Sequence, residues 1–271
     1  MNDKARFSLT HFPLPKNAQG KTFYAEGTGY GRLRRAFRQT VDDHTVGVLW
    51  GEAGVGKTTA IRQLTGELPR PDYQVLYLCN TAGSPLDLYR SLAGEIGVRS
   101  SHRRGQLWAD IKRALVHMVD ERGTAPVVVL DEAQLLSDAF LADLAGFLNF
   151  AFDSRELMTV WLVGLPPLVK RLHLQQHEAL RTRIAVEIRH ESLDRATFGA
   201  AVEHAFKAAG ATSALLSDPA VELLFRSSRG VLRAASKILR VAMRVAGEKN
   251  QTFLDEHTVE AALAELGAGG A

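Results

Sequence analysis

The residues with the clearest chemistry form a glycine-rich loop that ends in a lysine and a threonine. They match the full pattern of a phosphate-binding loop. The loop and the residue after it are Gly51, Glu52, Ala53, Gly54, Val55, Gly56, Lys57, Thr58 and Thr59. The glycines let backbone N–H groups face phosphate oxygens, Lys57 would reach the β- and γ-phosphates, and the Thr58 hydroxyl would ligate Mg²⁺. An apolar run before the loop and an amphipathic run after it argue against a chance glycine turn and predict binding of ATP with Mg²⁺.

Two adjacent acids follow a second apolar run, residues 127–130, and complement the loop. Asp131, at the carboxyl edge of a strand, would hold Mg²⁺ through water, and Glu132 would polarise the water that attacks the γ-phosphate. Such a pair on its own is often only a strand end. Together with the loop it indicates NTP hydrolysis rather than transfer to a small acceptor. Gln134 could either sense the phosphate or cap the next helix.

Three arginines later in the chain are candidates for neutralising transition-state charge. Arg181 and Arg183 stand at a turn, and such guanidinium groups often act on a phosphoryl group from a neighbouring subunit. A pair of surface salt bridges is the alternative. Arg233, near the start of a later helix, could close over the γ-phosphate and couple the nucleotide state to rotation of a second domain. Its alternative is a solvated helix residue.

Positive charge is grouped, although the formal net charge is only +3. Residues 99–113 hold five Lys and Arg against one acid, and residues 226–249 hold seven against one. In the second group the basic residues recur every three or four positions, which predicts a ridge along one helix face from Arg226 to Arg244. Local basic patches bind phosphate backbones, but most such patches are merely solvated faces.

The elements that must position these residues are visible as an alternation of apolar runs and helical periodicity. The expected strands are residues 46–50, 74–79, 127–131, 159–163 and 184–189, and the helices between them are residues 58–67, 86–95, 106–121 and 139–152. Strands separated by helices predict a parallel sheet with helices on both faces. After about residue 191 only helical patterns follow, at 194–209, 217–227, 231–246 and 255–265. The sequence therefore predicts an α/β domain followed by a small all-helical domain.

Composition excludes several other classes of protein. The 271 residues are 46% hydrophobic and 23% charged, which is typical of soluble globular chains and argues against wholesale disorder. No uncharged run reaches the roughly 20 residues of a bilayer span, and charges near the N-terminus disfavour a secretory leader. The single cysteine, Cys79, cannot form an internal disulfide and offers no metal cluster. These features favour a cytoplasmic protein with no membrane segment.

Five segments resemble, in order, those of the AAA+ ATPases: GEAGVGKTT, VVVLDEAQ, WLVGLPPLVKRL, LRTRI and SRGVLRAASKIL. The resemblance is to the branch that contains the ExeA-type secretion ATPase domain and the TnsC/TniB-like transposition regulators, and it covers about residues 12–266. It implies a P-loop NTPase fold, a parallel sheet flanked by helices, followed by a small all-α lid domain. The implied boundaries are an arm and first helix at 1–45, the ATPase core at 46–191, the lid at 192–266 and a flexible tail at 267–271.

The resemblance also assigns roles. It makes Arg183 the better arginine-finger candidate, Arg181 the second, and Arg233 a sensor-II arginine. One departure concerns the polar sensor that such proteins often place after the fourth strand, because this position falls near Leu165. Leucine cannot hydrogen-bond a water or a phosphate. Hydrolysis is therefore expected to be slow unless Thr159 or another group substitutes.

The resemblance implies a function in DNA transactions: a protein that assembles with itself as a ring or filament on duplex DNA, and selects a target or activates a transposase. In related assemblies the region of residues 99–104 tends to face the central channel, where it would contact the DNA backbone without reading bases. The expected DNA contacts are Arg99, Arg103, Arg104, Lys112 and Arg113. A solvated loop is the alternative.

Two other functions compete with this one. ExeA-type proteins drive assembly of a secretion apparatus, and they usually continue into a transmembrane segment and a periplasmic domain. The end of this chain soon after its last expected helix favours the DNA-binding class. A stand-alone signalling switch without DNA is the third possibility.

Overall fold

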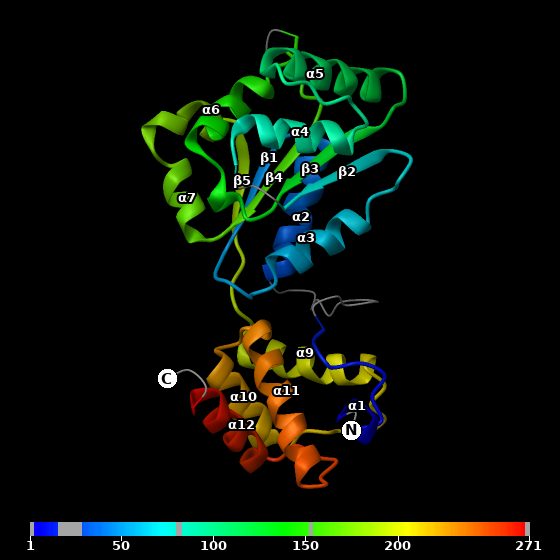
Figure 1. Ribbon diagram of the computed structural model, residues 1–271, viewed down its shortest axis with the longest axis vertical. Coiled ribbons are helices and arrows are strands. Elements are labelled where there is room, and N and C mark those ends of the chain that lie inside the picture. The colour runs from blue at the N-terminus through cyan, green and yellow to red at the C-terminus, as the bar shows by residue number, and fades with distance from the viewer. Residues whose placement is uncertain (1–2, 16–28, 80–82, 152–153, 269–271) are drawn as a thin grey trace. The chain divides into compact units, whose positions relative to one another are not determined.

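The computed structural model describes residues 3–15, 29–79, 83–151 and 154–268. Two compact units make up the chain (Figure 1). Residues 29–53 and 57–190 form one, which we call the core unit. Residues 191–271 form the other, which we call the helical unit, together with residues 1–28 and 54–56.

Five parallel strands form the sheet of the core unit, in the order β2-β3-β4-β1-β5. They are β1 (Val46–Trp50), β2 (Tyr73–Leu78), β3 (Ala125–Leu130), β4 (Thr159–Gly164) and β5 (Ile184–Arg189). The three inner strands are buried almost throughout, because a parallel sheet is covered on both faces. The expected α/β P-loop NTPase fold is confirmed, and each strand lies within two residues of its predicted bounds.

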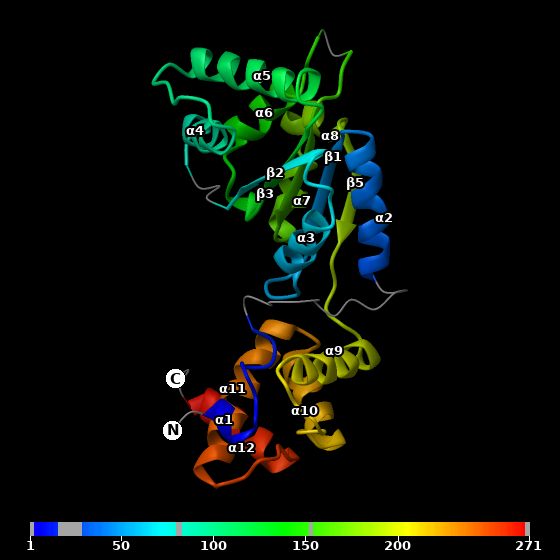
Figure 2. The ribbon, with the colours of Figure 1, turned by 90° about the vertical axis from the view of Figure 1, so that its right-hand side faces the viewer.

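Helices cover the sheet on both sides. On one side lie α4 (Pro85–Glu95), α5 (Arg104–Asp120) and α6 (Asp138–Phe147), and α2 (Gly29–Asp42) lies on the other (Figure 2). The Trp161 ring of β4 packs against Phe37 of α2 with ring centroids 5.6 Å apart, and its Nε1 donates to Thr40 Oγ1. Gly47 of β1 leaves room for that ring, since a Cβ there would lie 2.6 Å from it.

Short helices complete the described part of the core unit: η1 (Ala133–Leu135), α7 (Pro166–Leu172), η2 (Gln175–His177) and α8 (Glu178–Arg181). Hydrophobic periodicity does not predict them because each has two turns or fewer. Helix α3 (Lys57–Gly66) follows the glycine-rich loop. Helix α6 ends at Phe147 rather than at 152, and Phe152 lies outside the described residues.

The helical unit contains α9 (Arg195–Ala208), α10 (Asp218–Ser228), α11 (Leu232–Glu248) and α12 (Glu256–Ala268). The chain's first described residues, with α1 (Asp3–Arg6), pack on these helices. Phe7 and Leu9 are buried in their core, and the Thr10 N–H donates to the Ala209 carbonyl at 2.8 Å. The described part of the N-terminal arm, expected beside the ATPase core, therefore belongs to the helical unit. Of the expected tail, Gly267 and Ala268 end α12, and residues 269–271 lie outside the description.

The predicted basic ridge does not run unbroken from Arg226 to Arg244, because its residues are divided between two helices. Its later members share an exposed face of α11: Arg233, Lys237, Arg240 and Arg244. Arg226 lies in α10 and pairs with Glu222, and Arg229 caps α10 with a left-handed φ of 52°. Further along, Arg240 lies over the Phe12 ring and Arg244 pairs with Glu248 and Glu265. The chain turns between α10 and α11, so residues spaced at helical intervals across that turn do not share a face. The apolar stripe of α11 is buried as expected.

Candidate nucleotide-binding site

The glycine-rich loop joins the carboxyl end of β1 to α3, which begins at Lys57. Gly54 and Gly56 have φ angles of 84° and 106°, in the left-handed region that side chains rarely adopt. The Gly51 N–H donates to the Gly164 carbonyl at 3.3 Å, which ties the start of the loop to the end of β4. Glu52 and Ala53 are exposed, Val55 is buried, and Thr59 stands in the first turn of α3. The strand–loop–helix context expected for the motif is present.

Lys57 is held inside the loop. Its Nζ donates to the carbonyl oxygens of Gly51 and Glu52, both at 2.9 Å, and the side chain is only 9% exposed. A buried ammonium group requires hydrogen-bond partners, and the loop carbonyls supply them. The positive charge that the motif directs at phosphates therefore stands within the loop.

Asp131 links the loop to the end of β3. Its Oδ2 accepts from the Thr58 hydroxyl and from the Tyr77 hydroxyl, each at 2.8 Å, and its Oδ1 accepts from the Glu132 N–H at 2.9 Å. These groups meet because the carboxyl ends of parallel strands lie at one edge of the sheet. Partial burial and donation to Asp131 raise the pKa of Tyr77 well above its ordinary value. Tyr77 has no sequence signal, since it stands as an ordinary aromatic in an edge strand.

The pair of Thr58 and Asp131 fits a magnesium ion. A hydroxyl and a carboxylate are hard oxygen ligands, and Mg²⁺ is usually held by one or two carboxylates with water and substrate phosphates completing its shell. In the described part of the chain no three His, Cys, Asp or Glu side chains cluster as a metal site. The donors present suit an ion bound jointly with a nucleotide.

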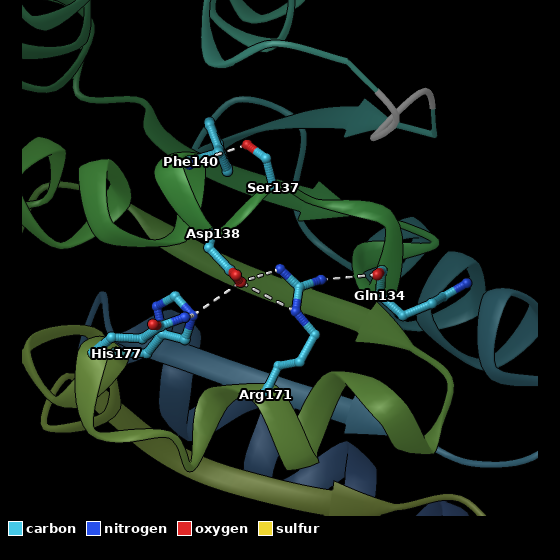
Figure 3. A network of polar contacts seen from close by, with 7 residues as sticks. Gln134, Ser137, Asp138, Phe140, Arg171 and His177 are labelled. Atoms are coloured by element: carbon cyan, nitrogen blue, oxygen red, sulfur yellow. Dashed lines mark hydrogen bonds and ion pairs between the residues drawn. The ribbon is translucent and has the colours of Figure 1, made fainter.

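Glu132 stands on a strained turn directly after Asp131. It has φ 54° and ψ 36°, a left-handed conformation that is uncommon outside glycine, and its side chain is exposed. Its Oε2 accepts from the Gln134 Nε2 at 2.7 Å. The Gln134 Oε1 in turn accepts from the Leu165 N–H at 3.0 Å. Gln134 does not cap the next helix, because the Ser137 side chain accepts from the Phe140 N–H at the start of α6 (Figure 3).

Thr159 does not replace the polar sensor that is missing near Leu165. That residue begins β4, at the opposite edge of the sheet, and its buried hydroxyl donates to the Thr40 carbonyl at 3.2 Å. Leu165 caps α7 through its backbone position, and its N–H is the group that meets Gln134. Among the described residues, the side chain that bonds the Leu165 N–H is that of Gln134, which reaches the end of β4 from the turn after β3.

Residues 39–172 match the family described as AAA domain. This match covers just under half of the chain. General secretion pathway protein A of Aeromonas hydrophila is 29% identical over 192 residues, which cover 70% of this chain but only 35% of that protein. The chain thus spans well under two thirds of that relative's length.

Two solved structures share the fold at low sequence identity. The Aeropyrum pernix ORC2 protein in its ADPNP–ADP complexes has a TM-score of 0.72 at 16% identity, over 97% of this chain and 72% of that one. Drosophila ORC bound to DNA has a TM-score of 0.69 at 17% identity, over 97% of this chain and 65% of that one. Identity this low shows the fold alone. The family match and the loop geometry agree on a P-loop nucleotide site in this fold.

The two finger candidates lie far from the phosphate loop of the same core unit. Arg181 ends α8 and stands 3.8 Å from Glu178, and the half-buried Arg183 directly precedes β5. Because β5 runs parallel to β1, both arginines stand at the amino ends of the strands, whereas the loop stands at the carboxyl ends. A strand of six residues spans about 20 Å, more than an arginine side chain can bridge.

A polar network joins the turn after Glu132 to the segment before these arginines (Figure 3). Arg171 of α7 donates from Nη1 to the Gln134 carbonyl at 3.0 Å and pairs with Asp138. Asp138 also meets Nε2 of the buried His177, in η2, at 3.1 Å. Hydrogen bonds from Arg171 first, and then from His177, lower the pKa of Asp138 below its ordinary value. Local sequence gives no signal for this network, since its members are far apart in the chain.

Arg233 lies in the helical unit, in the first turn of α11, with an exposed side chain. Gly230, just before that helix, has φ 73°, and a Cβ there would lie 2.1 Å from the Leu193 carbonyl oxygen. The turn that presents Arg233 therefore requires glycine. A sensor role for Arg233 stays a prediction.

Three of the five residues expected to contact DNA instead contact other residues of this protein. Arg104 pairs with Asp143 and Arg113 with Asp110. Lys112 donates to the Asn149 carbonyl and lies over the rings of Trp108, Phe147 and Phe150, and its burial lowers its pKa. The exposed Arg99 and Arg103 have no side-chain partner among the described residues.

Among the residues that the structure describes, no helix is both long enough and apolar enough to cross a bilayer.

Proposed function

We propose that this protein is an oligomeric AAA+ ATPase that binds duplex DNA in an ATP-dependent manner. The observation that carries the proposal is the separation between the phosphate loop and Arg181 and Arg183 within one core unit. One copy holds the phosphate-binding and acidic groups but cannot bring its own finger candidates to them. Completion of the site by a second copy resolves the separation.

The nucleotide groups have separate roles. Lys57 exchanges its bonds to the Gly51 and Glu52 carbonyls for bonds to β- and γ-phosphate oxygens. Thr58 and Asp131 hold Mg²⁺, which when bound would neutralise charge on the phosphates. Glu132 accepts the proton of the attacking water. Arg183 of a neighbouring copy, with Arg181 as the second candidate, stabilises the charge that develops on the transferring phosphoryl group.

DNA binding is supported by arginines that the fold leaves available. Arg99 and Arg103 flank the turn before α5. A second group, Arg62, Arg70 and Arg122, lines an open cavity of about 650 Å³ beside the amino end of β2. None of these three has a side-chain partner within the described ranges. Unpaired guanidinium groups favour a phosphate backbone, and one of the structures that share this fold is bound to DNA.

Selection of a target or activation of a transposase is the specific task that we propose for this assembly. A second candidate is a motor in a secretion apparatus, which the match to general secretion pathway protein A favours. The two differ in their dependence on DNA. ATPase activity of the first should rise when duplex DNA is added, and that of the second should not.

The test of the shared site is a mixing experiment. Arg183→Ala protein lacks the finger and Glu132→Gln protein lacks the base, so each alone should be nearly inactive. A mixture should recover activity, because some interfaces combine the intact Glu132 of one copy with the intact Arg183 of its neighbour. Activity per subunit of the wild type should also rise with protein concentration. No recovery together with concentration-independent turnover would contradict the shared site.

Electron microscopy with a non-hydrolysable ATP analogue, with and without duplex DNA, tests the assembly directly. Rings or filaments that form with the analogue, and that bind or lengthen on DNA, are expected. Analogue-dependent assembly with no DNA binding at any salt concentration would reject the DNA-binding function and favour the secretion candidate.

A further inference from the structure

We infer that Gln134 is the positioning residue for the catalytic carboxylate, which it fixes against the backbone at the end of β4. The inference rests on the proposed role of Glu132 as the base. It adds a residue that neither the phosphate-loop motif nor the acidic pair includes, and it says what replaces the polar side chain expected near Leu165.

The first link is the bond to Glu132. Gln134 Nε2 donates to Glu132 Oε2 at 2.7 Å, a short bond of the charge-assisted kind. Glu132 is exposed and stands on a left-handed turn, so its carboxylate has several rotamers within reach. Engaging one oxygen restricts those rotamers and fixes the direction of the other oxygen, Oε1.

The second link anchors the amide. Gln134 Oε1 accepts from the Leu165 N–H at 3.0 Å, so the amide oxygen faces β4 and the amide nitrogen must face Glu132. The two bonds together make Gln134 a bridge between the turn after β3 and the first residue after β4. Leu165 takes part through its N–H, which any residue except proline would supply.

The third observation is that Gly164 leaves space for the Gln134 amide and that Arg171 binds the Gln134 backbone. A Cβ on Gly164 would lie 2.8 Å from Gln134 Oε1 and 3.2 Å from the Gln134 backbone nitrogen, so only glycine leaves the amide in place. The Gln134 carbonyl accepts from Arg171, which Asp138 holds in turn (Figure 3). The side chain of Gln134 is thus bonded to Leu165 and its backbone to Arg171, both of which lie outside the turn that carries Gln134.

Positioning of this kind predicts a loss in turnover without a loss in nucleotide affinity. Gln134→Ala should lower kcat about tenfold to hundredfold, because small misplacements of a catalytic group cost rates of that order. The KM for ATP should stay within about twofold, since Lys57 and the loop are untouched. Gln134→Met keeps the length and packing but neither hydrogen bond, and should be as slow as Gln134→Ala. Gln106→Ala, which removes an exposed amide from α5, is the matched control and should keep the wild-type kcat.

Gly164→Ala supplies an independent route to the same defect. The added methyl should displace the amide and lower kcat as Gln134→Ala does. The double variant Gln134→Ala with Gly164→Ala should be no slower than the slower single variant, because the closest contact of the added methyl, the Gln134 amide oxygen, is gone. Thermal unfolding of each variant shows whether it is folded at the assay temperature. If Gln134→Ala is unfolded there, the kcat of Gln134→Met tests the inference instead.

Two outcomes would overturn the inference while leaving the proposed function standing. One is a Gln134→Met protein with wild-type kcat beside an inactive Glu132→Gln protein. The other is fully additive losses in the double variant. If Glu132→Gln itself hydrolyses ATP normally, the proposed base fails, and the inference about Gln134 fails with it.

Discussion

The carboxyl edge of the sheet and the arginine-rich segment 99–113 carry charge in opposite ways. At the sheet edge the charged groups of Lys57, Asp131 and Glu132 contact backbone atoms or polar side chains of the same site. In the segment, Arg104, Lys112 and Arg113 are satisfied by residues outside any shared site, and two of their partners come from α6 or just after it. The charged groups of the first region are thus gathered into one site, whereas most of those in the second make separate contacts within the protein.

The difference teaches that spacing identifies chemistry only where backbone geometry enforces it. The loop places successive residues around one point because its glycines and the helix after it fix the backbone. Arginines on a surface helix reach several neighbours, and the acid that takes each one is chosen by packing. Exposed ion pairs of this kind contribute about 0–1 kcal/mol to stability, and a paired arginine must leave its acid before it binds a phosphate.

The largest effect we expect is from Lys57→Ala. Removal of the ammonium group takes away the loop's own side-chain charge on the phosphates, so ATP binding should fall below detection. Lys170→Ala, which removes an exposed lysine from α7, is the matched control and should bind ATP as the wild type does. Binding of a fluorescent ATP analogue measures both. Retained affinity in Lys57→Ala would mean that the loop amides alone hold the nucleotide and would weaken the contrast between the two regions.

The sequence predicts the site well where its groups are contiguous or end a buried strand. Lys57, Thr58, Asp131 and the five strands follow from a loop consensus and from apolar runs, which are local. The bridge of Gln134 to Leu165, the Tyr77 hydroxyl and the Arg171 network join segments that are distant in the chain. Their existence depends on the order of the strands, which puts β3 between β2 and β4. Helical periodicity also fails at the turn between α10 and α11, because spacing alone does not show that the axis changes there.

An effect of intermediate size, on duplex DNA binding, is expected from substitution of Arg99 and Arg103. Arg99→Ala with Arg103→Ala should weaken duplex binding to a similar extent on all sequences, and should lower the slope of log affinity against log salt by roughly one for each phosphate that is no longer neutralised. Arg104→Ala with Arg113→Ala is the matched control, since those two charges are already paired, and should change the slope much less. Fluorescence anisotropy across a salt series measures both. Equal effects of the two pairs would show that surface ion pairs leave arginines free for DNA, and no effect of either pair would direct attention to Arg62, Arg70 and Arg122.

The smallest effect we expect is from Tyr77→Phe. Loss of this hydroxyl removes one of the three hydrogen bonds that Asp131 accepts, while those from Thr58 and the Glu132 N–H remain. Asp131 should then be less firmly placed, and half-maximal ATPase activity should need about two- to twelvefold more Mg²⁺, in line with roughly 0.5–1.5 kcal/mol for one net hydrogen bond.

The pH dependence of that defect tests the electrostatics of Tyr77. Partial burial and donation to Asp131 raise its pKa, so the folded protein favours the neutral phenol. The contribution of the phenol is therefore complete below the ordinary tyrosine pKa near 10 and is lost only as the pH rises beyond it. The ratio of Mg²⁺ requirements between Tyr77→Phe and wild type should thus stay constant from about pH 6 to about pH 9. A ratio that falls toward one within this range would mean that Tyr77 ionises there and that it does not serve as a permanent donor to Asp131.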